Sequence, residues 1–254
     1  MRVETIGNAT MYLGDAREII HSLSGIACVV TSPPYNQLGA TANPSGLWKG
    51  NSFGNAVTQD WDEKGYFDSL TEKDYQIEQN KIFSDISSAC NPDASLFYNH
   101  QLRWRDGECL HPIIWFHPEN WRMRTEVIWD RGGGMMLNAR MFCRYDERII
   151  WFIRGKKWKW NQDQVGLGTV WRISAAQNKE HPVAFPVEVP LRCIMATTDL
   201  GDVVLDPYSG SASTGVAAVA NGRKYIGIER DEKYFDIGCR RIEQAQRQLD
   251  MFIN

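Results

Sequence analysis

An apolar run that ends in two prolines constrains the fold of this chain more than any other feature. The run IACVVTSPPY occupies residues 26–35 and lacks the polar alternation of a half-exposed strand. Such runs, when bounded by a break, are typical of strands buried on both faces of a parallel sheet. Because proline lacks a backbone N–H donor, the strand should end near Pro33 and Pro34. We therefore expect a buried parallel strand that leads into a loop.

Strand and helix patterns alternate along the rest of the chain. Strands are expected at MYL, ASLFYNH, TEVIWD, RIIWFIR, VVLD and KYIGIE, and helices at REIIHSL, near residues 71–90, at VEVPLRCIMAT and after the last two strands. This alternation favours an α/β fold with a mostly parallel sheet and helices on both faces. Because we find no repeat and no linker, we expect a single domain over residues 1–254. Variable segments at 37–65 and 155–180 would be inserted in it.

Composition excludes several classes of protein. Of the 254 residues, 43% are hydrophobic and 23% are charged, as in ordinary globular proteins and unlike disordered chains. No apolar run approaches the roughly 18 residues of a membrane span, and the N-terminus lacks a signal-peptide core. We expect a cytoplasmic protein with no membrane partner. The six cysteines form no CxxC pair, so we expect reduced thiols and no metal site.

A glycine- and serine-rich turn follows one of the late strands. In VVLDPYSGSAST, at residues 203–214, a strand runs into small residues and then a helix. Such a turn lets backbone N–H groups approach a ligand closely. About 20 residues later the strand KYIGIE ends in Glu229, where an acid typically accepts hydrogen bonds from ribose hydroxyls. The pair predicts an adenosine-containing cofactor. A plain turn at Gly210 and a solvated glutamate would be the structural alternative. Ala212 replaces the second glycine of the dinucleotide fingerprint, which disfavours a dehydrogenase.

The segment TSPPYN, at residues 31–36, is the most specific feature of the sequence. Prolines fix the backbone, so the neighbouring carbonyl oxygens can be held pointing into a cavity. Ser32 adds a hydroxyl, and Tyr35 adds a flat ring. Together they are suited to hold the exocyclic amino group of a planar base that has left the duplex stack. The structural alternative is a strand end broken by proline, with a tyrosine in the core.

Taken together, these segments resemble the DNA amino-methyltransferases, which use S-adenosylmethionine to methylate N4 of cytosine or N6 of adenine. The resemblance rests on TSPPY, LDPYSGSAST, GDA at 14–16, HPVAFP at 181–186 and GIERDEKYFDIGCRRI at 227–242. The catalytic motif comes first and the cofactor turn last, as in the circularly permuted beta class. The resemblance implies a Rossmann-like, mostly parallel, seven-stranded methyltransferase sheet in permuted order. It also implies S-adenosylmethionine as cofactor, S-adenosylhomocysteine as product, no metal, and double-stranded DNA as substrate.

The same resemblance implies a role for individual residues. The implied catalytic residues are Ser32, Pro33, Pro34 and Tyr35. The implied cofactor-binding residues are Asp15, Thr31, His181, Pro182, Phe185, Pro186, Asp206, Tyr208, Ser209, Gly210, Ser211 and Glu229. The chain departs from the family at Ala212, where glycine is usual. If this position requires a positive φ, alanine would weaken cofactor binding. Because alanine is still small, we expect the replacement to be tolerated.

The residue before the two prolines bears on the target base. In the family, serine there is associated with N4 of cytosine and aspartate with N6 of adenine, so Ser32 favours cytosine. We expect direct in-line attack by the amino nitrogen of a flipped-out base, without a covalent enzyme intermediate. Adenine stays the first alternative, and a non-catalytic nucleic-acid-binding protein of the same fold is the alternative of another class. The chain has no Pro-Cys dipeptide, which disfavours a C5-cytosine enzyme.

A tract of cations and indoles is the candidate DNA contact. In RGKKWKW, at residues 154–160, Lys156, Lys157 and Lys159 alternate with Trp158 and Trp160. Cations can neutralise phosphates and indoles can stack on bases. A solvated surface whose tryptophans pack on the core is the alternative. The resemblance also leaves a cognate restriction endonuclease and a second copy of the chain as open partners.

Overall fold

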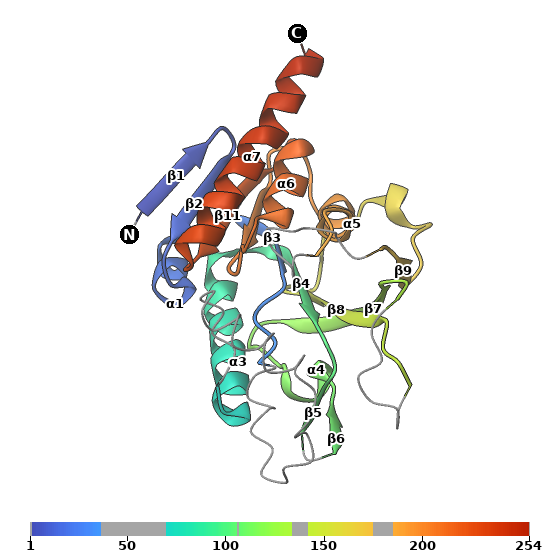
Figure 1. Cartoon of the computed structure of the whole chain (residues 1–254). Coiled ribbons are helices and arrows are strands. Elements are labelled where there is room, and N and C mark those ends of the chain that lie inside the picture. Colours follow the sequence, from blue (N-terminus) through green and yellow to red (C-terminus); the bar gives the residue numbers. More distant parts are fainter. Residues whose placement is uncertain (1, 37–69, 106, 134–141, 175–184, 254) are drawn as a thin grey trace, which may run out of the picture.

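A computed structural model describes residues 2–36, 70–105, 107–133, 142–174 and 185–253. Their main feature is a twisted sheet (Figure 1) with the strand order β1-β2-β11-β10-β3-β4-β8-β7-β9. In chain order its strands are β1 (Arg2–Ile6), β2 (Ala9–Leu13), β3 (Ile26–Thr31), β4 (Cys90–His100), β7 (Arg122–Asp130), β8 (Asp146–Ile153), β9 (Val170–Arg172), β10 (Val203–Asp206) and β11 (Lys224–Glu229). β5 (Arg103–Arg105) and β6 (Glu108–Leu110) form a separate pair.

The sheet confirms the mostly parallel α/β architecture. Pairs β2–β11, β11–β10, β10–β3, β3–β4 and β7–β9 are parallel, whereas β1–β2, β4–β8 and β8–β7 are antiparallel. The expected seven strands run from β2 to β7 in spatial order. β1 and β9, which the sequence did not predict, extend the sheet at its two edges.

Helices cover both faces of the sheet, as Figure 1 shows. They are α1 (Ala16–Ile19), the 3-10 turn η1 (Ile20–Ser22), α3 (Glu72–Ala89), α4 (Pro112–Trp115), η3 (Gln162–Gln164), α5 (Glu188–Thr197), α6 (Ser213–Ala220) and α7 (Glu232–Ile253). One core cluster contains residues of α5, α6 and α7, and the other contains residues of α1, α3 and α4. Along β3, Cys28 and Val30 join the first cluster, and Ile26 and Val29 join the second. Because successive side chains alternate between faces, a strand buried on both faces reads as a continuous apolar run.

The connections define where the sheet can bind a ligand. The chain leaves β3 through α3 to β4, and it leaves β10 through α6 to β11, on the other side of the β10–β3 pair. Neighbouring parallel strands whose connections diverge form a crevice at their carboxyl ends, where ligands bind in α/β sheets. The two motifs singled out in the sequence follow β3 and β10. The fold therefore brings them to one crevice.

Candidate active site

The TSPPYN segment leaves the carboxyl end of β3 as a half-buried loop. Every residue of β3 is buried, and so is Pro33, while Ser32, Pro34 and Tyr35 are partly exposed. The Ser32 Oγ lies 2.6 Å from the Tyr35 hydroxyl. Tyr35 in turn donates to Oε2 of Glu147 at 2.9 Å. The four expected catalytic residues thus form one loop, and a buried carboxylate holds its tyrosine.

Asn99, near the end of β4, joins the same cluster of side chains. Its Nδ2 lies 2.8 Å from Oε2 of Glu147, 2.7 Å from the Tyr35 hydroxyl and 3.3 Å from Oγ of Ser32. Asn99 is 3% exposed and Glu147 is 6% exposed. The register of the antiparallel pair β4–β8, with Asn99 opposite Ile149 and His100 opposite Arg148, brings Glu147 to this end of the sheet.

A second polar cluster, from α3 and the end of β4, contacts the loop. The Tyr75 hydroxyl donates to the carbonyl oxygen of Pro34 at 2.7 Å and lies 2.9 Å from Nε2 of His100. The His100 ring packs 4.7 Å from the Tyr35 ring, between centroids. Burial lowers the pKa of His100 to about 3, so its ring is neutral at ordinary pH. The loop is therefore held by both its backbone and its side chains.

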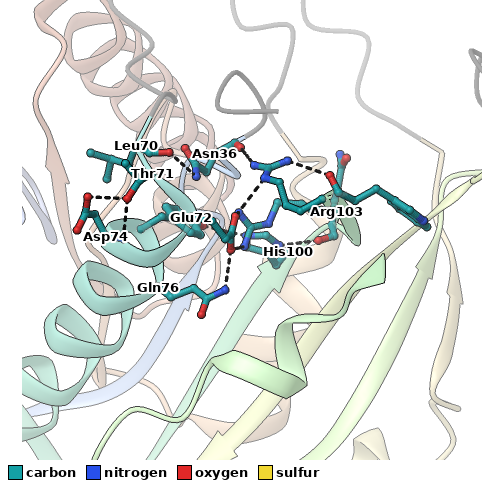
Figure 2. Close-up of polar contacts among 12 residues, drawn as sticks. Asn36, Leu70, Thr71, Glu72, Asp74, Gln76, His100 and Arg103 are labelled. Carbon is teal, nitrogen blue, oxygen red and sulfur yellow. Dashed lines mark hydrogen bonds and ion pairs between the residues drawn. The ribbon is translucent and has the colours of Figure 1, made fainter. Parts of the chain in front are cut away.

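Figure 2 shows how this second cluster reaches the end of the loop. Arg103 donates two hydrogen bonds of 2.7 Å each to Glu72, near the start of α3. Arg105 donates to the backbone carbonyl oxygen of Asn36. The side-chain amide of Asn36 in turn donates to the backbone carbonyl oxygen of Leu70. Because Asn36 has a φ of 53°, the loop turns sharply at this residue, and these bonds fix the turn.

On the cofactor side, a buried aspartate links the two motifs. Oδ1 of Asp206 accepts from the Thr31 hydroxyl at 2.7 Å, and Oδ2 accepts from the Thr214 hydroxyl at 2.8 Å. Burial raises the pKa of Asp206 to about 6. Thr31 immediately precedes Ser32, so this contact joins the end of β10 to the start of the catalytic loop.

Glu229 ends β11 beside the glycine turn. Its carboxylate accepts from the backbone N–H of Gly210 at 2.7 Å and from that of Asp231 at 2.8 Å. Burial raises the pKa of Glu229 to about 6. Asp15 lies at the same edge, because Gly14 donates to the Glu229 carbonyl oxygen at 2.9 Å. The Asp15 carboxylate caps α1, and hydrogen bonds from Arg17 lower its pKa.

Other predicted cofactor residues present backbone rather than side chains. Ser209 is 5% exposed, and its hydroxyl pairs with that of Tyr225 at 2.8 Å. Ser211 is 1% exposed, and its hydroxyl accepts from Arg241 at 2.8 Å. The Tyr208 hydroxyl accepts from Gln79 at 3.1 Å. These side chains fix the turn, which leaves its backbone groups as the ones that face the crevice.

Ala212 occupies the conformation that glycine would favour. Its φ of 58° and ψ of 43° lie in the left-handed region, and Gly210 also has a positive φ of 50°. The condition under which alanine strains the turn is therefore met. A left-handed alanine costs about 1 kcal/mol relative to its usual conformation.

The segment before α5 is described only in part. Phe185 and Pro186 are half-buried, and Phe185 packs against the core. They precede α5, which runs from the carboxyl edge of the sheet back toward the start of β10. His181 and Pro182 lie outside the described residues, as does the whole of the variable segment 37–65.

The basic tract 154–160 lies at the opposite edge of the sheet. It follows the last residue of β8, and Arg154 donates from its backbone to Ala94, far from Asn99 along β4. Lys159 pairs with Asp199 and Asp202 just before β10. Trp158 packs against the core beneath Arg124. The tract is therefore remote from the TSPPYN loop, and its tryptophan and one lysine are already partnered. Its contact with DNA stays a prediction.

Three side chains of the site had no signal in the sequence. Glu147, Asn99 and Tyr75 lie in segments that read as ordinary strand and helix, and only the long-range pairing of β4 with β8 and the packing of α3 bring them to the loop. Within the described residues, no group of three or more His, Cys, Asp or Glu side chains is placed to hold a metal ion. No described helix has both the length and the apolarity that crossing a bilayer requires.

A family model described as DNA methylase, covering the N6 and N4 enzymes, matches residues 26–240, from the start of β3 into α7. The chain belongs to this DNA methylase family. The matched span includes both motifs and the two strands that carry them. The methylase fold is therefore shown by sequence and by structure alike.

Relatives of this methylase include a Type II methyltransferase and a DNA adenine methyltransferase. It is 24% identical to Type II methyltransferase M.Cfr9I of Citrobacter freundii, over 94% of this chain and 89% of that one. It is 41% identical to the DNA adenine methyltransferase YhdJ of Escherichia coli, over only 31% of this chain and 28% of that one.

Solved structures share the whole fold. The cytosine-N4-specific PvuII DNA methyltransferase superposes with a TM-score of 0.72 at 19% identity, over 96% of this chain and 93% of that one. A DNA modification methylase of Thermus thermophilus, complexed with S-adenosylmethionine, has a TM-score of 0.64 at 21% identity, over 92% and 93%.

Proposed function

We propose that this DNA methylase transfers a methyl group from S-adenosylmethionine to the N4 amino group of cytosine in a flipped-out base. One observation carries the proposal. The Ser-Pro-Pro-Tyr loop and the glycine turn leave adjacent strands, and the Thr31–Asp206 hydrogen bond of 2.7 Å joins them. An amino group held by the loop therefore lies within reach of a cofactor held by the turn.

The residues at the carboxyl edge fit the parts of this cofactor. The Glu229 carboxylate accepts from backbone N–H groups, including those of Gly210 and Asp231, and its oxygens keep acceptor capacity for ribose hydroxyls. Asp15, which follows the next strand β2 and caps α1, is the candidate for the adenine amino group. The turn at Gly210 has no side chain to block an approaching ligand. When bound, the cofactor supplies an electrophilic methyl group on a sulfonium sulfur.

The loop residues would prepare the amino nitrogen for attack. Its lone pair is delocalised into the ring, and acceptors at Ser32 Oγ and the Pro33 carbonyl favour a more tetrahedral nitrogen. The Tyr35 ring offers a face to the base. Catalysis then rests on positioning and electrostatics, and the amino proton leaves to Ser32 or to water.

Adenine is the second candidate base. Ser32 and the likeness to a cytosine-N4-specific enzyme support cytosine, whereas the 41% identical segment of an adenine methyltransferase supports adenine.

The names of the Type II relatives support a cognate restriction endonuclease as a partner. We assign the DNA contact to the carboxyl edge of the sheet. Arg131 directly follows β7 there, and Arg172 is the last residue of β9, with a side chain that is 86% exposed.

Nucleoside mass spectrometry tests the proposal. DNA is taken from a methylation-deficient host that expresses the wild type, Ser32→Ala or Ser88→Ala. Ser88 is a matched control because its hydroxyl caps only its own helix. We expect N4-methylcytosine with the wild type and the control, and a strong loss with Ser32→Ala. N6-methyladenine would overturn the choice of base. Neither mark, with S-adenosylmethionine still bound, would favour a non-catalytic nucleic-acid-binding role.

A further inference from the structure

We propose that Glu147 is a positioning residue that sets the direction of the hydrogen bonds in the catalytic loop, so that Ser32 accepts a hydrogen bond from the target amino group. The inference rests on the proposed function and deepens it. Glu147 lies on β8, 112 positions from Tyr35, and belongs to neither sequence motif.

The direction follows from counting protons. A carboxylate can only accept, so the single phenolic proton of Tyr35 points to Oε2 of Glu147 at 2.9 Å. The Tyr35 oxygen must then accept in its 2.6 Å contact with Ser32, and Ser32 donates its own proton there. The remaining capacity of Ser32 Oγ toward the crevice is acceptor capacity. The amino group of a base presents two N–H donors and therefore requires an acceptor at this position.

Glu147 fixes Asn99 by the same rule. Only the NH₂ end of the amide can face the carboxylate, at 2.8 Å, so the amide cannot flip without losing this bond. The opposite end, Oδ1 of Asn99, is buried and has no hydrogen-bond partner among the described residues. Buried acceptors are rarely left unpaired, so this oxygen keeps acceptor capacity that the described residues do not use.

The charge of Glu147 is itself held in place. Oε1 accepts from Nε2 of Gln101 at 3.0 Å and forms an ion pair with Nη1 of Arg131 at 3.2 Å. Amide and guanidinium groups donate and cannot accept at these nitrogens. The carboxylate therefore faces donors on both oxygens. A glutamine at this position would place an NH₂ group against at least one of them.

The test compares Glu147→Gln, Tyr35→Phe and the double variant in single-turnover methyl transfer from labelled S-adenosylmethionine to DNA of an unmethylated host. Glu126→Gln is the matched control, because Glu126 is a paired carboxylate on the neighbouring strand whose partners are His111 and Arg148. The dissociation constant of S-adenosylmethionine is measured on each preparation. The stoichiometry of its binding corrects each rate for any protein that fails to fold.

We expect Glu147→Gln to slow transfer about 10- to 100-fold while the dissociation constant of the cofactor changes less than twofold. The double variant should be no more than about threefold slower than Glu147→Gln, because both changes interrupt one chain of bonds. A rate within twofold of wild type, or losses that multiply in the double variant, would overturn the inference. If the wild type transfers no methyl group, the proposed function fails instead.

Discussion

Two carboxylates at the same edge of the sheet, the half-buried Glu229 and the buried Glu147, are held in different ways. Glu229 accepts from backbone N–H groups, one of them two residues away in the chain. Glu147 accepts from the side chains of Tyr35, Asn99 and Gln101, and pairs with Arg131. The first arrangement fixes a turn and keeps acceptors for a neutral ligand. The second fixes the direction of other side chains, which suits a catalytic loop.

The largest expected effect comes from a second negative charge beside Glu147. Asn99→Asp would place two carboxylates where the nitrogen and oxygen atoms are now 2.8 Å apart. We expect the free energy of unfolding at pH 8 to fall by about 3 kcal/mol, because burying like charges is costly. Urea unfolding measures it. The loss should shrink at pH 5, when one carboxylate takes up a proton. An equal loss at both values of pH would mean that charge is not the cause.

The free energy of unfolding should also depend on the protonation of Asp206 and Glu229. Burial raises the pKa values of Asp206 and Glu229 to about 6, above their usual 3.8 and 4.5. The folded state then binds these protons more tightly than the unfolded state. Their contribution is fully present below pH 4 and is lost as pH rises through 6, by about 3 kcal/mol for Asp206 and about 2 kcal/mol for Glu229.

Asp206→Asn isolates one of these groups. The asparagine does not titrate, so the free energy of unfolding of the variant should rise relative to that of the wild type as the pH is raised from 4.5 to 7. His100, whose pKa is lowered to about 3, contributes in the opposite direction but equally in both proteins. Denaturant titrations at several values of pH measure this. Asp15 has a lowered pKa and titrates below this window, so it does not mask the effect. An unchanged pH dependence would refute the assignment of the proton to Asp206.

A smaller effect is expected at the strained turn. Ala212→Gly removes a left-handed alanine, with a φ of 58°, at the start of α6. We expect the free energy of unfolding to rise by about 0.5 to 1 kcal/mol. Ala218→Gly, within the same helix, should lower it by about 1 kcal/mol or more. If both variants are destabilised alike, the left-handed conformation carries no strain.

The smallest effect is expected at the opposite edge. Lys156→Ala combined with Lys157→Ala removes two exposed cations of the basic tract. Because the tract lies away from the catalytic loop, the affinity for DNA and its dependence on salt should change less than twofold. Arg172→Ala at the carboxyl edge should weaken binding more. A reversed order would move the DNA contact back to residues 154–160.

The two carboxylates also differ in whether the sequence predicts their place in the site. The β10 turn, Glu229 and the Ser32 loop lie in short contiguous motifs at strand ends, and the alternation of strands and helices implies that they meet. Glu147 lies between Asp146 and Arg148, and because charged neighbours of this kind are common in strands, they do not mark Glu147 as part of a site. Its place depends on the register of β8 against β4. For the same reason the sequence does not show where the tract 154–160 lies: the antiparallel direction of β8 carries it to the other edge.

The central claim is a division of labour between the two carboxylates, and paired measurements on Glu229→Gln and Glu147→Gln test it most directly. Cofactor affinity is measured by calorimetry and methyl transfer by single turnover at saturating S-adenosylmethionine. We predict that Glu229→Gln weakens the cofactor about 30- to 100-fold and changes the saturated rate less than threefold. Glu147→Gln should do the reverse. If each variant lowers affinity and rate together, the two carboxylates act as one site and the division is wrong.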